Sequence, residues 1–332
     1  VRQTTCYMCA CRCGINVHLR TGEDGEPKVR YIEGNRDHPV NKGVLCAKGS
    51  AGIMQHYSPA RLEQPLLRTG PRGSGEFKKI SWEEALTLAC EWLGPLREDP
   101  KKLAFFTGRD QSQSLTNFWA QNFGTPNYAA HGGFCSVNMA AAGIYTIGGA
   151  FWEFGSPDWD RTKMFMIFGV AEDHDSNPIK MGLGKIKARG ARVIGVNPIR
   201  TGYNAIADDW VGITPGTDGL FILSLVHELM RAGKIDLDYL ARYTNAPVLV
   251  NNDPKSSEKG LFLRDDDGKP LVIDRKTGKL TAFDEPGVRP DLHATFRHAG
   301  ITHRPVFHLM AERYLDDQYA PERAARHCGI TA

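Results

Sequence analysis

The stretch C-Y-M-C-A-C-R-C-G at residues 6–14 is followed by V-L-C-A-K-G-S at residues 44–50. Cys6, Cys9 and Cys13 form a C-x2-C-x3-C run, and Cys46 stands alone in the second stretch. Three thiolates on one tight loop and a fourth on a later turn are typical of a [4Fe–4S] site. A structural four-cysteine zinc site is the alternative, but zinc motifs usually present two pairs of cysteines. The spacing therefore favours an iron–sulfur cluster.

Cys11 lies inside the triplet and has to be assigned. A one-residue gap between Cys9 and Cys11 leaves little room for the two thiolates to reach separate irons. Cys13 is followed by Gly14, which permits close approach of the backbone to a cofactor. We therefore predict Cys6, Cys9, Cys13 and Cys46 as ligands and Cys11 as a spare thiol.

Composition sets the broad class. The 332 residues suffice for two or three domains, and 41% hydrophobic with 24% charged residues is ordinary for a soluble globular protein. The formal charge is only +3, and no block of basic residues occurs, so no nucleic-acid partner is expected. Eight cysteines clustered towards the N-terminus suit a metal site in a reducing compartment, so we expect a cytoplasmic protein.

No direct membrane span is expected. The richest apolar window, residues 139–152, is interrupted by three glycines and is shorter than a bilayer requires. Any membrane attachment would come through a partner. Because the chain begins with Val1, we expect that it has lost its start or is a processed or partial product.

Hydrophobic periodicity predicts an α/β fold after a small N-terminal domain. Residues 81–84 (S-W-E-E) form a capping box that opens a helix, and Cys90 is expected in the core on its apolar face. From residue 101, strands alternate with helices, which predicts parallel βαβ units in a doubly wound sheet. The strands are expected at 103–107, 164–168 and 192–196, and the helices at 112–123, 179–188 and 218–232.

Polar residues follow these strands at 169–177, 197–204 and 214–218. Ligands of doubly wound sheets bind at the carboxyl ends of the strands, so a nucleotide-like ligand is predicted there, with ordinary turns as the alternative. The G-x-G-x-x-G fingerprint is missing, because Gly182 and Gly184 fall inside a predicted helix, and direct NAD binding is not expected. Residues 246–299 carry turn signals at 265–268 and 276–278 and are predicted to form a β-rich excursion.

Together these motifs resemble the catalytic subunits of the dimethyl sulfoxide reductase family of molybdenum and tungsten enzymes. The resemblance runs from residue 4 to nearly the end of the chain. It rests on the cysteine motif with C-A-K-G at 46–49, F-G-T-P-N at 123–127, Cys135, N-P-I-R-T at 197–201 and P-G-T-D at 215–218. The sequences at residues 6–14 and 131–136 most resemble those of the quinone-linked cytoplasmic sulfite dehydrogenases.

The resemblance implies a [4Fe–4S] cluster and molybdenum, or tungsten, held by two molybdopterin guanine dinucleotides. It implies a cluster domain at 1–60, the first part of a discontinuous α/β domain at 61–134, and an α/β dinucleotide-binding domain at 135–332. Family members also carry a C-terminal half that this chain does not contain, so turnover by this chain alone is not expected.

Site residues carry over position by position. Cys135 matches the protein ligand of the metal, where an anionic sulfur stabilises a high-valent ion. Lys48 matches a lysine between the cluster and the pterin, where a cation would favour passage of an electron. Residues implied in dinucleotide binding are Asn197, Arg200, Thr201, Gly216, Thr217 and Asp218, the last of which pairs with guanine. Gly169, Glu172 and His174 match less well, because residues 169–178 read G-V-A-E-D-H-D-S-N-P where the family has G-x-N and a closing H-P.

The implied function is oxidation of sulfite or another sulfur oxyanion, a small-molecule substrate. Electrons would pass through the pterin, Lys48 and the cluster to an iron–sulfur partner and then to a quinone-reactive membrane protein of the same complex. The protein would then be cytoplasmic, or peripheral on the inner face of the membrane through a partner. Formate dehydrogenase is the rival enzyme, although that group has a histidine directly after its metal-bound residue and this chain has Ser136. A non-catalytic iron–sulfur electron-transfer subunit is the alternative from another class.

Overall fold

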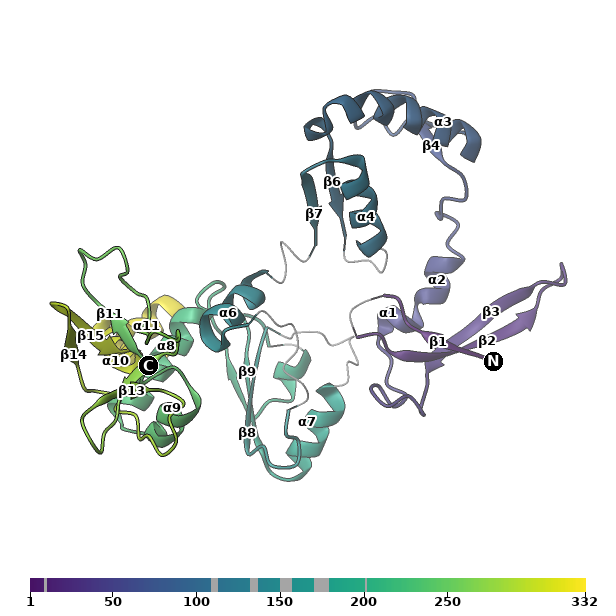
Figure 1. The fold of residues 1–332 in the computed structure, drawn as a ribbon. Helices are drawn as coiled ribbons and strands as arrows, with labels where there is room; N and C mark the ends of the chain where they lie inside the picture. Colours follow the sequence, from purple (N-terminus) through teal and green to yellow (C-terminus); the bar gives the residue numbers. More distant parts are fainter. Residues whose placement is uncertain (9–10, 109–112, 132–136, 150–156, 170–178, 201) are drawn as a thin grey trace. The chain divides into compact units, whose positions relative to one another are not determined.

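The structure is a computed structural model that describes all residues except 9–10, 109–112, 132–136, 150–156, 170–178 and 201 (Figure 1). The chain divides into two compact units. The first comprises Val1–Phe165 and Glu172–Val193, and the second comprises Met166–Ala171 and Ile194–Ala332.

An antiparallel three-stranded sheet forms the start of the first unit, in the order β1-β2-β3. Its strands are β1 (Arg2–Thr5), β2 (Gly14–Thr21) and β3 (Pro27–Gly34). The short helices α1 (Ala47–Ser50) and α2 (Gly52–His56) contact β3, and the Tyr57 hydroxyl accepts the Val29 N–H at 2.7 Å. The sheet supports the loop that carries the cysteine triplet, because β1 ends at Thr5 and β2 begins at Gly14.

A parallel β-α-β unit follows later in the first unit. Strands β6 (Ala104–Thr107) and β7 (Asn127–Ala130) pair in parallel, and α4 (Gln113–Phe123) connects them and contacts both. This confirms the predicted change to alternating strands and helices. The other elements are β4 (Leu66–Arg68), β5 (Phe77–Lys79), α3 (Trp82–Leu93), η1 (Gly94–Glu98), η2 (Pro100–Lys102), α6 (Val137–Ile147) and α7 (Ile179–Ala188).

Helix α3 begins as predicted, because the Ser81 side chain accepts the Glu84 N–H at 3.0 Å. Its burial differs from the prediction. Cys90 is exposed, and no residue of α3 is buried. The interpretation of Cys90 as a core residue is therefore wrong for this structure: the apolar face of α3, with Trp82 68% exposed, has no cover in the part of the chain that the structure describes.

The strands β8 (Met164–Phe168), β9 (Arg192–Val196) and β10 (Asp209–Val211) form a sheet in the order β10-β9-β8, with β9 and β10 parallel. The turn η3 (Gly202–Ala205) lies between β9 and β10. The α/β class predicted from the sequence is confirmed, although the sheets formed by the described residues are small. Gly182 and Gly184 lie inside α7, as expected for a chain without the dinucleotide fingerprint.

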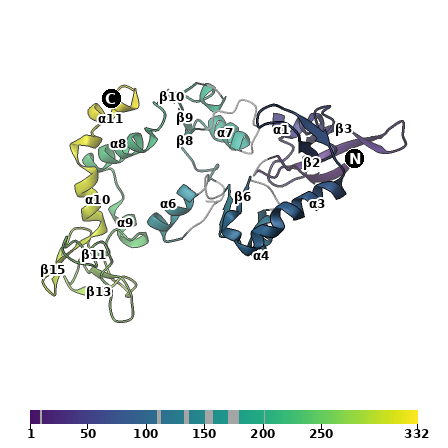
Figure 2. The same ribbon diagram turned by 90° about the horizontal axis from the view of Figure 1, so that it is seen from above.

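Three helices pack together in the second unit. Helix α8 (Asp218–Arg231) contacts both α10 (Val306–Tyr314) and α11 (Pro321–Cys328), and both views show the three side by side (Figures 1 and 2). The turn η4 (Asp317–Tyr319) joins α10 to α11. Val196, Ile213 and Cys328 are buried together, so the ends of β9 and α11 meet the chain that follows β10 in one core.

The predicted β-rich excursion is present in the second unit. It contains β11 (Leu249–Asn251), β12 (Leu271–Ile273), β13 (Leu280–Ala282), β14 (Phe296–His298) and β15 (Ile301–Pro305), after α9 (Leu237–Tyr243). Both predicted turns form: the Asp265 N–H donates to Lys269 O at 3.0 Å, and β12 pairs antiparallel with β13. Within the described ranges, no helix combines the length and apolar character that a membrane crossing requires.

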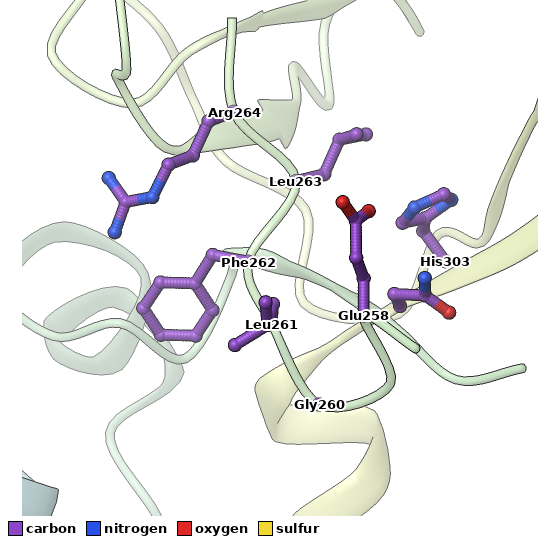
Figure 3. A pocket seen from close by; sticks show the side chains of 8 residues that line it. Glu258, Gly260, Leu261, Phe262, Leu263, Arg264 and His303 are labelled. Carbon is purple, nitrogen blue, oxygen red and sulfur yellow. The ribbon is translucent and has the colours of Figure 1, made fainter. Parts of the chain in front are cut away.

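A pocket of about 520 Å³ opens in this excursion (Figure 3). Glu258, Leu261, Phe262 and His303 all line this hollow. His303 is only 4% exposed. Burial disfavours the imidazolium ion and lowers the pKa of His303 below its ordinary value of about 6.5. The ring is therefore neutral in the folded protein near neutral pH.

His303 should make the second unit sensitive to acid. Its pKa is lower in the folded than in the unfolded chain, so the unfolded chain binds more protons as pH falls below about 6.5. Stability due to this residue is present above that pH and is lost below it. His303→Gln should therefore flatten the fall in melting temperature between about pH 7 and pH 5. His327→Gln, at an exposed position of α11, is the control; equal pH profiles for His303→Gln and wild type would contradict the assignment.

Candidate functional site

The cysteines predicted to hold the cluster lie on two segments that approach each other near Cys6. Cys6 and Cys13 are both buried, and the Cys6 N–H donates to Cys13 O at 2.7 Å, which closes the triplet loop. Cys46 is half-buried and directly precedes α1, where Ser50 N–H donates to Cys46 O at 3.0 Å. Cys11 is exposed, and its assignment as a spare thiol stays a prediction. Cys9 lies outside the described residues.

Gly49 brings the Cys46 segment close to the triplet. It is buried in α1, and a Cβ atom placed there would lie 3.4 Å from Cys6 Sγ and 2.5 Å from Leu45 Cδ1. Only glycine leaves that space open, so α1 can approach Cys6 closely. Soft thiolate donors on two converging segments are chemically suited to an iron–sulfur cluster. Among the described residues, no three cysteine, histidine or acidic side chains converge as they would around a single metal ion.

Asn41 joins the two segments, and the sequence analysis missed it. The residue is completely buried. Its Oδ1 accepts the Gly14 N–H at 2.8 Å, and its Nδ2 donates to Gly14 O at 3.1 Å and to Val44 O at 2.8 Å. One amide thus fixes the residue after Cys13 to the segment just before Cys46. Its position between the two cysteine motifs was the only sequence feature that could have indicated this role. An isolated asparagine in a sequence does not show which groups it will contact.

Replacing Asn41 should loosen the cluster domain. Asn41→Ala removes the side-chain acceptor of the Gly14 N–H and the side-chain donor to the Val44 carbonyl, each at a cost of about 1–3 kcal/mol if the group stays buried and unpaired. The Gly14 carbonyl also loses one donor but keeps the Asn35 N–H at 2.9 Å. We expect lower stability against urea and faster loss of the visible absorption of the cluster in air. The control is Asn35→Ala, which removes one local bond from Asp37 N–H. Equal stability and equal bleaching of the two variants would contradict the role given to Asn41.

The ligand assignment can be tested by the colour of the purified protein. Cys6→Ala, Cys13→Ala and Cys46→Ala should each lose iron and the brown absorption, because each removes one of the four thiolates that a cubane requires. Cys11→Ala, the matched variant inside the same loop, should keep both. If Cys11→Ala bleaches the protein while Cys13→Ala does not, the triplet has been assigned to the wrong residues.

The predicted nucleotide loops follow neighbouring strands. Gly169 follows β8, and its N–H donates to Val196 O at 3.0 Å. Asn197 follows β9; its N–H donates to Val211 O at 3.1 Å, and its carbonyl accepts the Trp210 indole N–H at 2.9 Å. The main chain of Asn197 is therefore fixed at the carboxyl end of β9, where doubly wound folds bind their ligands.

The side chain of Asn197 is suited to bind a ligand. Asn197 is 4% exposed, and its Nδ2 has no hydrogen-bond partner among the described residues. A buried amide without a partner costs about 1–3 kcal/mol, so such a group calls for a ligand or a further polar contact. Nearby, a Cβ atom at Gly195 would lie 2.1 Å from Asn204 Oδ1, so the loop after β9 folds back tightly onto the strand.

The loop at 214–218 is a rigid turn at the start of α8. Thr217 donates its hydroxyl to Thr214 O at 2.7 Å, and Gly216 has φ of 82°, in the region that favours glycine. Asp218 is half-buried in the first turn of α8, where the positive end of the helix dipole favours a carboxylate. Thr214 N–H donates to Cys328 O at 2.8 Å, so the end of α11 holds the turn in place.

The remaining predicted residues are placed as follows. Lys48 is exposed in α1, two residues after Cys46, and Arg200 is exposed in the loop after β9. Cys135, Glu172, His174 and Thr201 lie outside the described residues. The structure thus places Cys6 and Cys13 on one buried loop, with the Cys46 segment approaching Cys6 at Gly49. It places Gly169, Asn197 and the turn at 214–218 after neighbouring strands of one sheet.

Two family models match the chain. "Molybdopterin oxidoreductase Fe4S4 domain" matches residues 1–58, and "Molybdopterin oxidoreductase" matches residues 61–277, which is more than half of the chain. The chain belongs to the molybdopterin oxidoreductase family. The expected [4Fe–4S] cluster and molybdenum–molybdopterin cofactor are confirmed at the level of the family, and the zinc alternative is set aside. The individual site residues stay predictions.

Relatives of known name support the same family. A sulfite dehydrogenase subunit of Allochromatium vinosum is 54% identical, over 100% of this chain and 35% of its own length. The molybdopterin-containing subunit of thiosulfate reductase of Salmonella typhimurium is 27% identical over 90% of this chain and 39% of its own length. The major subunit of the nitrate-inducible formate dehydrogenase of Escherichia coli is 28% identical over 98% of this chain and 33% of its own. The chain spans about a third of the length of these molybdopterin oxidoreductases.

A solved structure shares the fold. Acetylene hydratase from Pelobacter acetylenicus aligns with a TM-score of 0.56 and 22% identity, over 72% of this chain and 33% of its own. The similarity supports the α/β architecture with its N-terminal cluster domain.

Proposed function

We propose that the chain is part of the catalytic subunit of a molybdenum oxidoreductase that oxidises sulfite or another sulfur oxyanion. The observation that carries this proposal is the 54% identity, along the whole chain, with the sulfite dehydrogenase relative. Identity with the formate dehydrogenase subunit is much lower, at 28%. Ser136 after Cys135, where formate dehydrogenases have histidine, also favours a sulfur oxyanion over formate.

The cofactors define what the chain contributes. When bound, the molybdenum–pterin group supplies two-electron redox chemistry, and the cluster accepts electrons singly. Cys6, Cys9, Cys13 and Cys46 would hold the cluster, while Cys135 would bind the metal. Lys48, two residues after a cluster ligand, would place a positive charge where an electron passes between the two cofactors.

The residues that follow β8, β9 and β10 would hold one guanine dinucleotide. Asn197 would offer its buried amide, and Arg200 and Thr201 would bind phosphate oxygens. Asp218 would accept the guanine N–H groups, with Gly216 and Thr217 shaping the turn that positions it. Gly169, Glu172 and His174 would line the neighbouring loop. With this assignment goes the proposed division into a cluster domain at 1–60, the first part of a discontinuous α/β domain at 61–134 and an α/β dinucleotide-binding domain at 135–332.

We extend the proposal to the assembly. The sulfite dehydrogenase relative is named as one subunit of its enzyme, and we infer that this chain also works with partner chains. These would be an iron–sulfur electron-transfer protein and a quinone-reactive membrane protein. The catalytic part would then lie on the cytoplasmic side, attached to the membrane through its partners.

The test is a substrate comparison in the complete enzyme that contains this chain. We expect iron together with molybdenum or tungsten, and sulfite-dependent reduction of an artificial electron acceptor at least about tenfold faster than formate-dependent reduction, which corresponds to about 1.4 kcal/mol. Cys135→Ala should abolish this activity and leave the iron content unchanged, because it removes one bond to the metal only. Cys90→Ala, at an exposed position of α3, is the control.

The other outcomes separate the alternatives. Faster reduction by formate would make the protein a formate dehydrogenase. Iron without molybdenum or tungsten would make it an electron-transfer subunit, and zinc alone would exclude both. Wild-type activity of Cys135→Ala would remove Cys135 from the metal site.

A further inference from the structure

A second pocket in the second unit is lined by basic side chains. It measures about 930 Å³ and lies between α9, the loop after β12 and residues 287–293. Four of its lining residues are cations at neutral pH: Arg242, Arg275, Lys276 and Arg289. None of them belongs to the cluster site or to the predicted nucleotide loops.

These four cations are not neutralised within the described part of the chain, where none of them forms an ion pair. Two carboxylates also line the pocket, and one of them has other partners. Asp291 Oδ1 accepts the N–H groups of His293 at 2.7 Å and of Ala294 at 3.0 Å. The four cations outnumber the two lining carboxylates, Asp238 and Asp291, so the pocket has a surplus of positive charge.

The backbone that carries three of the cations is held by Asp274. This buried carboxylate accepts the N–H groups of Lys276, Thr277 and Arg289 at 3.3, 3.2 and 3.1 Å. Arg275 N–H donates to Arg289 O at 2.7 Å, so the two arginines lie on paired segments. The hydrogen bonds, led by that from the Thr277 hydroxyl, lower the pKa of Asp274 and keep it ionised. The backbone of Arg275, Lys276 and Arg289 is thus held in place by hydrogen bonds.

The floor of the pocket is apolar and rigid. Leu292 is buried in the same core cluster as Phe307, and Ala241 packs against that cluster. Leu237, 42% exposed, also lines the pocket. A ligand that fits must therefore combine negative charges with some apolar surface.

The four cations are exposed to solvent, and this exposure favours one class of ligand over another. Arg242, Arg275, Lys276 and Arg289 are all exposed, and a lone phosphate or sulfate held by them would stay solvated and weakly bound. A protein surface that covers them would exclude water and strengthen each pairing, and charge complementarity is how such surfaces find their partners. We propose that this pocket is the docking site for an acidic segment of a partner subunit, with apolar side chains between its carboxylates. This inference rests on the proposed function only in assuming a multi-subunit enzyme.

The first test uses the purified chain and a labelled synthetic peptide, Glu-Glu-Leu-Glu-Glu-Leu, followed by fluorescence anisotropy. We expect binding that weakens as salt is added, and at least about tenfold weaker binding by Arg275→Glu/Arg289→Glu, because like charges then face the peptide. Lys255→Glu/Arg297→Glu is the matched control: it changes the net charge equally at two exposed positions outside the pocket. Circular dichroism and melting temperature establish that both variants are folded.

Three results of this test would overturn the proposal. They are no peptide binding by wild type at low salt, an equal loss in the control variant, and displacement of the peptide by inorganic triphosphate or an oligothymidylate at a lower concentration than by unlabelled peptide. The last result would identify the pocket as a site for phosphates or nucleic acid.

The second test identifies the source of the acidic segment in the intact enzyme. A carbodiimide joins an amine directly to a carboxylate that it touches, so it should couple Lys276 to a Glu or Asp of another subunit, and Lys276→Arg should abolish that product. A product within the same polypeptide, or no product from Lys276, would overturn docking of a partner. Neither readout depends on substrate turnover, so a failure of the sulfite assignment is distinguishable from a failure of this docking site.

Discussion

One buried amide ties together the two segments that carry the cluster cysteines. The triplet loop and the Cys46 turn come from different parts of the first fifty residues, and a cubane can form only if both are held at the right separation. Asn41 sets this separation through its bonds to Gly14 and Val44, and Gly49 permits the close approach of α1 to Cys6. The cluster domain thus has a protein frame of its own, made of neutral hydrogen bonds and close packing.

A sheet positions the residues of the predicted nucleotide site. The residues that would hold a dinucleotide follow neighbouring strands of one sheet, in which β9 and β10 are parallel. Main-chain hydrogen bonds fix Gly169, Asn197 and Thr214 at these positions. The polar groups left over, such as the amide of Asn197, are those that a ligand could satisfy. A rigid strand end with an unsatisfied side chain is a preorganised site, because little order has to be gained on binding.

The sequence predicted this architecture well where local signals were strong. The bounds of β8, α7 and β9 agree with the predicted ranges 164–168, 179–188 and 192–196, because a short apolar run or a clear helical period defined each of them. The capping box of α3 and the turn at 265–268 also formed, since both depend only on neighbouring residues. The cysteine spacing likewise predicted the cluster, which the family match supports.

The failures of prediction arose where contacts between residues distant in sequence decide the structure. Cys90 has the periodicity of a core residue, yet periodicity shows only that a face is apolar and not that another element covers it. Asn41 looked like any loop asparagine, because its bonds span up to 27 residues along the chain. The basic pocket was hidden for the same reason: Arg242, Arg275 and Arg289 are spread along the sequence and meet only in the folded protein.

The bond between Thr214 and Cys328 also has a consequence for biosynthesis. The turn that leads into α8 is held by the end of α11, and the contact of Cys328 with Thr217 spans 111 residues. A growing polypeptide therefore cannot complete this turn until α11 has left the ribosome, long after the cluster loops have emerged. The order of synthesis therefore makes the cysteine loops available early, whereas the turn at 214–218 gains its contacts with α11 late.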